Sequence, residues 1–130
     1  MIVVDASAML AVLLRLPSAE AVEERLFLPG QTLHAPHLLD VEVAQVLRRY
    51  ARTGAVPEDQ CGAALRDLAD MPIHRYPHGL LLQRVWALRN NVTAYDAVYV
   101  ALAEALDAPL LTRDRRLAGA PLDGARIDLV

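Results

Sequence analysis

The sequence predicts an α/β fold, a three-layer α/β/α sandwich with a central parallel sheet of four or five strands. First, strand-like and helix-like segments alternate along the whole chain. Second, Ile2–Val4 is an unbroken β-branched run, which is typical of a parallel strand buried on both faces. Third, the chain has 130 residues, which is long enough to enclose one hydrophobic core. Its 55% hydrophobic content excludes a disordered chain. We therefore expect a single domain over residues 1–130.

The remaining strands are expected where short apolar runs lie between breaker residues. They cover Thr32–Ala35, Pro72–Tyr76, Pro109–Thr112 and Arg126–Val130. The segment Pro72–Tyr76 fits a strand less well than the others, which leaves the number of strands at four or five.

Helices are expected between the strands, each bounded by a capping residue, a proline or a glycine. Ser7 and Ser18 are the expected N-caps of the first two helices, and Gly54 is expected to close the third. The expected helices cover Ala8–Arg15, the segment from Ser18 to the Pro29-Gly30 pair, His37–Arg52, Pro57–Asp70, His78–Arg89, Thr93–Leu106 and Asp114–Leu117.

Composition and charge exclude several classes of protein. Thirteen basic residues against sixteen acidic ones leave a net charge of −3, so no global positive field attracts nucleic acid. Every basic residue is an arginine, which excludes P-loop and Schiff-base enzymes because both need a lysine. The single cysteine, Cys61, excludes an internal disulfide or a thiolate zinc site and fits a reducing compartment. With no basic leader and no apolar stretch long enough for a bilayer, we expect a cytoplasmic protein that does not enter the membrane.

Several familiar motifs are absent from the sequence. There is no Gly-x-Gly for a dinucleotide, no Gly-x-Ser-x-Gly elbow and no His-Glu-x-x-His zinc motif. We interpret the four histidines as loop residues rather than as metal ligands. They are His34, His37, His74 and His78.

Two carboxylates follow expected strands directly. Asp5 ends the first strand, and Asp114 follows Thr112, the last residue of another. In open parallel sheets, ligands bind beyond the carboxyl ends of the strands, so both acids are candidate site residues. The structural alternatives are a polar stop before a helix for Asp5 and an N-cap for Asp114.

Glu42 lies on a helix face with Leu38, Leu39 and Val46. A carboxylate within an apolar stripe costs free energy unless it finds a partner. Glu42 is therefore a metal ligand aimed at the top of the sheet, one half of a salt bridge with an arginine, or a residue at the edge of the apolar helix face. Asp40 points elsewhere, and we interpret it as solvated.

Asp96 lies near the start of an expected helix. The segment Thr93-x-x-Asp96 matches a capping box, which is the structural alternative for this acid. Asp96 also shares a helix face with Tyr99 and Val100, which aims it inward.

The four acids together predict a divalent metal site. Carboxylates at close range repel one another, and a hard cation relieves that repulsion. Oxygen ligands without an available thiolate favour Mg²⁺ or Mn²⁺, which activates water and neutralises phosphate esters. The candidate residues are Asp5, Glu42, Asp96 and Asp114.

Four segments in this order resemble the PIN-domain ribonucleases, and more narrowly the VapC-type toxins of type II toxin–antitoxin pairs. They are Met-Ile-Val-Val-Asp5-Ala-Ser7, Leu39-x-x-Glu42-Val-Ala, Thr93-Ala-Tyr95-Asp96-Ala-x-Tyr99-Val-Ala-Leu-Ala-Glu104 and Leu111-Thr112-x-Asp114-x-x-Leu117. The resemblance spans essentially the whole chain, and Tyr-Asp-Ala-x-Tyr is its most specific piece. It implies that the four acids hold Mg²⁺ or Mn²⁺ and that the hydroxyls of Ser7 and Thr112 support them. It further implies endonucleolytic cleavage of RNA, inhibition by a cognate antitoxin protein, and a homodimer.

Two arginine clusters are candidates for RNA backbone contacts, because guanidinium groups bind phosphate bidentately. The alternative for both is a solvated face. The clusters are Arg48, Arg49 and Arg52 on one helix, and Arg113, Arg115 and Arg116 around Asp114.

Three other functions stay open at this point. The chain can be a PIN-domain nuclease for RNA processing or DNA, without an antitoxin. It can be a phosphatase or phosphoacceptor domain, although Asp5-Ala6-Ser7 lacks the second acid of an Asp-x-Asp loop. It can also be a binding module that kept the fold and lost catalysis.

Overall fold

The computed structural model describes all residues, 1–130, as a five-stranded parallel sheet between helices. The strands are β1 (Ile2–Val4), β2 (Leu33–Pro36), β3 (Ile73–Tyr76), β4 (Leu110–Thr112) and β5 (Ile127–Leu129). They follow the order β3-β2-β1-β4-β5, and every neighbouring pair is parallel. The expected α/β/α sandwich is confirmed, and the segment that fitted a strand least well forms the edge strand β3.

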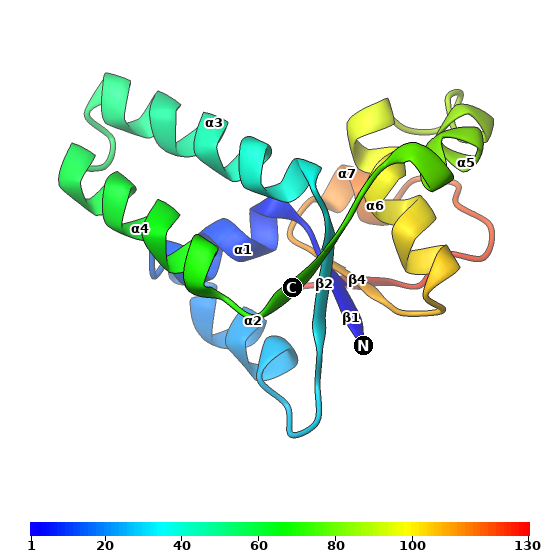
Figure 1. The fold of residues 1–130 in the computed structure, drawn as a ribbon, viewed down its shortest axis with the longest axis horizontal. Helices are drawn as coiled ribbons and strands as arrows, with labels where there is room; N and C mark the ends of the chain where they lie inside the picture. The colour runs from blue at the N-terminus through cyan, green and yellow to red at the C-terminus, as the bar shows by residue number, and fades with distance from the viewer.

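The helices form the two outer layers. Figure 1 shows α1 to α4 on one side of the sheet and α5, α6 and α7 on the other. Their bounds are α1 (Ala6–Leu13), α2 (Ala19–Leu26), α3 (Leu38–Thr53), α4 (Glu58–Asp70), α5 (Leu82–Ala87), α6 (Ala94–Ala105) and α7 (Arg115–Ala118). No helix is both long enough and apolar enough to cross a membrane.

Strand β1 is the centre of the core, as its β-branched sequence predicts. Val3 and Val4 are fully buried, and β1 pairs with β2 on one side and β4 on the other. Helix α6 packs over β1, β2 and β4 with an unbroken buried stretch from Ala97 to Ala103. Because β1 and β4 are parallel neighbours, Asp5 and the end of β4 meet at the same edge of the sheet.

One expected helix cap is wrong. Asp5, not Ser7, is the N-cap of α1: its carboxylate accepts a hydrogen bond from the backbone N–H of Ala8 at 2.9 Å. Ser7 lies inside the first turn instead. Ser18 occupies the N-cap position of α2 as expected, but its hydroxyl makes no capping bond and is buried without a hydrogen-bond partner. The expected stop at Gly54 is confirmed, because this residue ends α3 with a left-handed backbone at φ 74°.

The expected helix over His78–Arg89 is divided in two. A 3₁₀ turn at Gly79–Leu81 precedes the short helix α5. Leu80 is 95% exposed while Leu81 is buried.

Three polar residues have partners that the sequence did not suggest. His34 is a buried residue of β2, not a loop residue, and its ring is held between the hydroxyls of Thr32 at 2.8 Å and Tyr76 at 2.7 Å. His74 likewise lies in β3, stacked on His34. Asp40 is paired with Arg75 at 2.8 Å rather than simply solvated.

Candidate active site

Asp5 is the most buried of the four candidate acids, with 7% of its surface exposed. One carboxylate oxygen, Oδ1, accepts hydrogen bonds from the Ser7 hydroxyl at 2.7 Å and from Ala8 N–H at 2.9 Å. The other, Oδ2, accepts a short bond from the Thr112 hydroxyl. Burial raises the pKa of Asp5, and these three donors oppose that rise because they stabilise the anion. The donors also fix the direction in which the carboxylate points.

Ser7 and Thr112 connect the ends of the two central strands. The Thr112 hydroxyl accepts a bond from Asp114 N–H at 2.9 Å, and the Ser7 hydroxyl accepts one from Arg113 N–H at 2.9 Å. Both hydroxyls therefore donate to Asp5 and accept from the loop after β4. The structure places Ser7 and Thr112 beside the acids, where the resemblance implied that they support them.

Glu42 reaches toward the sheet edge from α3. Its Oε1 accepts a 2.6 Å hydrogen bond from the hydroxyl of Tyr99 on α6. Burial raises the pKa of Glu42, the Tyr99 bond lowers it, and the nearby charges of Asp96 and Asp5 raise it again. Burial and the contact with Glu42 also raise the pKa of Tyr99, so the phenol stays protonated and acts as the donor. The partner of Glu42 is therefore a tyrosine and not an arginine.

Asp96 and Asp114 each belong to a helix start. Thr93 caps α6 by accepting a bond from the backbone N–H of Asp96 at 3.2 Å, as the capping pattern predicts. Burial, followed by the charge of Asp114, raises the pKa of the half-buried Asp96. Asp114 caps α7 through Oδ1, which accepts from Arg116 N–H at 2.8 Å and Leu117 N–H at 3.4 Å. The capping role of Asp114 is therefore confirmed, and its Oδ2 is left without a partner in the chain.

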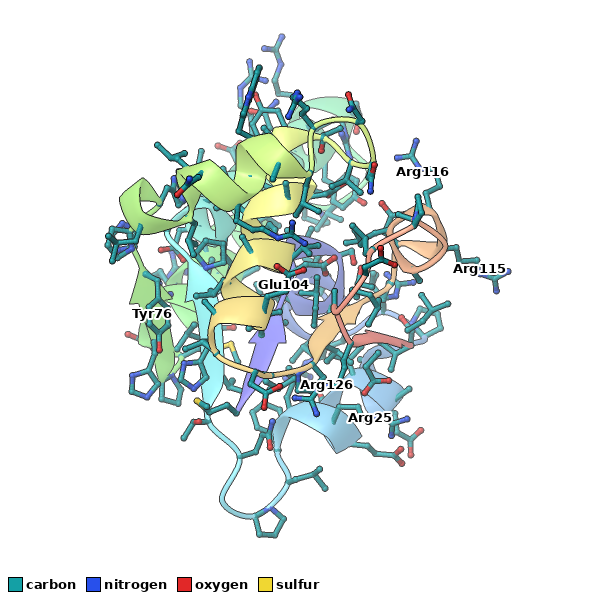
Figure 2. The ribbon with its side chains drawn as sticks, turned by 90° about the vertical axis from the view of Figure 1, so that its right-hand side faces the viewer. Arg25, Tyr76, Glu104, Arg115, Arg116 and Arg126 are labelled. Carbon is teal, nitrogen blue, oxygen red and sulfur yellow. The ribbon has the colours of Figure 1, made fainter.

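All four acids line one cavity of about 490 Å³, here called the acid cavity. Its other polar walls come from α1, α3, α6, the β4–α7 loop and α7. The lining includes Ser7, Arg49, Tyr50, Tyr99, Arg113 and Arg116. Among the remaining candidate arginines, Arg48, Arg52 and Arg115 are not part of the wall. Figure 2 shows Arg115 and Arg116 extending from α7 in different directions.

The donor set fits a hard divalent cation. The lining offers carboxylate oxygens without a competing thiolate or imidazole, and the acids raise one another's pKa values. The acids are not yet gathered closely around one point: no three histidine, cysteine, aspartate or glutamate side chains form a preassembled ligand group. A cation bound among these acids would relieve the repulsion between their carboxylates.

Tyr50 is the one polar residue of the acid cavity that the sequence analysis did not name. Tyr99 was placed on the inward face of its helix, but not identified as the partner of Glu42. Tyr99 follows Asp96 by three residues and the candidate Arg49 follows Glu42 by seven, so each lies on the same helix face as an acid. The Arg49 guanidinium also lies 5.6 Å from the ring centre of Tyr50, which lines the same wall.

Comparison with known proteins places the chain in a family. The PIN domain family matches residues 2–121. Ribonuclease VapC1 of Mycobacterium tuberculosis is 48% identical over 129 residues, 98% of this chain and 96% of that protein. Ribonuclease VapC9 of the same species is 45% identical over 118 residues, 91% of this chain and 89% of its own length. Among solved structures, VapBC2 from Rickettsia felis bound to a promoter DNA fragment superposes with a TM-score of 0.73 at 12% identity, covering 100% of this chain and 99% of that one. The chain therefore belongs to the PIN-domain family, among relatives that are VapC ribonucleases.

Proposed function

We propose that the protein is a Mg²⁺- or Mn²⁺-dependent endoribonuclease whose metal is held by Asp5, Glu42, Asp96 and Asp114. The observation that carries this proposal is the acid cavity, which gathers carboxylates from four separate segments at the carboxyl edge of a parallel sheet. A bound divalent cation activates water and neutralises the phosphate that is attacked.

The chain's own residues prepare the acids for that task. A carboxylate must be ionised to ligate a metal, and burial works against ionisation. Thr112, Ser7 and Ala8 N–H offset this for Asp5, and Tyr99 does so for Glu42. We assign the guanidinium groups of Arg113 and Arg116, at the rim of the same cavity, to contacts with RNA phosphates.

We further propose that the protein is the toxin of a toxin–antitoxin pair, acts on RNA in the cytoplasm and forms a homodimer. The VapC relatives and the VapBC structure support an antitoxin partner. Exposed apolar side chains of α3, α5 and α6 support association with protein: Val41 is 67%, Trp86 69% and Tyr95 64% exposed. Co-expression with the small protein encoded beside the gene should suppress cleavage, whereas a nuclease of RNA processing should be unaffected.

Cleavage mapping on total RNA tests the activity. The purified protein is incubated with Mg²⁺, Mn²⁺ or EDTA, and new RNA 5′ ends are sequenced. Asp96→Asn keeps the shape of the side chain, removes a proposed ligand charge and should abolish most cleavage. Asp40→Asn is the matched control, because Asp40 pairs with Arg75 outside the acid cavity. Discrete cleavage in EDTA, or full activity of Asp96→Asn, would contradict the proposal.

A further inference from the structure

A second cavity of about 450 Å³ adjoins the acid cavity. The two share Asp96, Asp114 and Arg116, so they meet at the acids. Beyond this shared boundary the second cavity is walled by the turn Arg89–Thr93 before α6 and by Leu117 and Ala120 at the end of α7. We call it the turn cavity.

The turn cavity has a different electrostatic character from the acid cavity. Apart from the shared Asp96 and Asp114, no lining residue carries negative charge. The charged and amide groups that it adds are the guanidinium of Arg89 and the side chains of Asn90 and Asn91. The acids therefore separate two regions with cationic groups, one with Arg49 and Arg113 and one with Arg89.

The turn that forms the wall is held in place by its own contacts. Nδ2 of Asn91 donates a 2.7 Å hydrogen bond to the carbonyl of Pro121, which ties the turn to the segment after α7. Arg89 lies over the ring of Trp86 at 4.8 Å and donates through Nη1 to the Trp86 carbonyl at 2.9 Å. Asn90 makes no hydrogen bond within the chain, so its amide is free to bind a ligand.

An RNA strand cut at the acids has to continue on both sides of the cleaved bond. The phosphates next to that bond carry charge that the carboxylates repel, so the strand is favoured along walls that carry guanidinium groups. The turn cavity, of about 450 Å³, lies within the roughly 300–1,000 Å³ of small-ligand sites, and the partly exposed Val92 and Ala120 supply its apolar surface. Side-chain amides are suited to the edges of unpaired bases, which they contact through paired donor and acceptor groups.

We propose that the turn cavity is a subsite for the nucleotide adjacent to the cleaved phosphodiester. Asn90 contacts the edge of its base, and Arg89 contacts its phosphate. The subsite rests on the proposed ribonuclease function and adds to it a position at which the enzyme distinguishes bases.

Two pairs of variants test the subsite. Asn90→Ala is compared with Gln60→Ala, which removes an exposed amide from α4. Arg89→Gln is compared with Arg66→Gln, which removes an exposed guanidinium from the same helix. Cleavage of a pool of short single-stranded RNAs with Mn²⁺ measures the base preference at each position around the cut. Fluorescence anisotropy of a labelled single-stranded RNA in EDTA measures binding without cleavage.

Asn90→Ala should reduce the base preference about tenfold at one position next to the cut and leave the other positions unchanged. Arg89→Gln should weaken binding and lower the salt slope by about 0.7, the loss of one phosphate contact to a single strand. Both control variants should match the wild type. If the two turn variants match their controls in both measurements, or the wild type binds no RNA in EDTA, the subsite is overturned. If the wild type binds RNA but never cleaves it, the proposed function fails while the binding arm still decides the subsite.

Discussion

The Tyr99 hydroxyl donates a 2.6 Å hydrogen bond to Oε1 of Glu42 and joins α6 to α3 across the acid cavity. The two residues are 57 positions apart in the sequence. Burial raises the pKa of the Glu42 carboxylate, and the Tyr99 phenol that donates to it stays protonated. It is the contact that favours the ionised form of Glu42, the form that a metal requires.

Tyr99→Phe should shift the pH dependence of cleavage. Phenylalanine fills the same buried space but removes the donor, so the pKa of Glu42 rises further and a larger fraction is protonated at acidic pH. The acid limb of the pH–rate profile should move to higher pH. A hydrogen bond to a charged group is worth about 1.5–3 kcal/mol, so activity below neutrality should fall about tenfold or more. The measurement is initial cleavage rate against pH with Mn²⁺, and an unshifted profile in a folded variant would refute this role of Tyr99.

Thr112→Val should destabilise the metal-free protein. Thr112 is fully buried, donates to Asp5 and accepts from Asp114 N–H, and valine removes the donor to Oδ2 of Asp5 and the acceptor of Asp114 N–H. The expected loss is about 1–3 kcal/mol of unfolding free energy, measured by urea denaturation in EDTA. Thr112→Ser keeps the hydroxyl and should lose less. Equal stability of the valine and serine variants would show that the hydroxyl contributes nothing.

The metal-free protein should gain stability from its acid cavity as pH falls from neutrality. Asp5, Glu42 and Asp96 have pKa values above their ordinary ones, so between the two values the folded state binds more protons than the unfolded state. Stability from these groups is therefore lost as pH rises through the folded pKa values and is regained on acidification toward about pH 4.

Thermal melts in EDTA at several pH values measure this dependence, and Asp96→Asn should weaken it.

Asp96→Asn should also reduce the increase in melting temperature that Mn²⁺ produces in the wild type at neutral pH, because a ligand that binds only the folded state stabilises it. If saturating Mn²⁺ does not change the melting temperature of the wild type, the protein has no metal site of useful affinity.

Arg113→Ala and Arg116→Ala should each weaken RNA binding, whereas Arg115→Ala should not. The first two line the acid cavity, and Arg115 does not. Figure 2 shows Arg115 extending from α7 in a different direction from Arg116. Each lost phosphate contact should lower the salt slope by about 0.7 for a single strand. A salt titration of RNA binding in EDTA measures this. If the salt slopes of all three variants equal that of the wild type, these arginines only cover a solvated turn.

The sequence by itself was sufficient to predict the parallel α/β architecture and to pick out the four acids that line the acid cavity. A β-branched run, the alternation of segments and the stop at Gly54 are local signals, and they predicted the parallel sheet, the third helix and the strand-end positions of Asp5 and Asp114. The inward face of Asp96 and the apolar face of Glu42 follow from helical spacing. Their use as metal ligands stays a prediction.

Tertiary structure alone decided which atoms each polar group meets. Local pattern favoured Ser7 as the cap of α1, but the carboxylate of Asp5 reaches Ala8 N–H because the chain turns directly from β1 into the helix. The sequence contains thirteen arginines that could pair with Asp40, and only the folded structure shows that its partner is Arg75 of β3.

The contacts that define the acid cavity join distant parts of the chain. Asp5 and Thr112 are 107 residues apart, and Asn91 in the wall of the turn cavity bonds to Pro121, 30 residues away. Hydrophobic periodicity indicates which face of an element is buried, since apolar side chains that recur along one face are favoured in the core. It does not specify a hydrogen-bond partner, because that choice depends on the positions of atoms brought together after the sheet has formed.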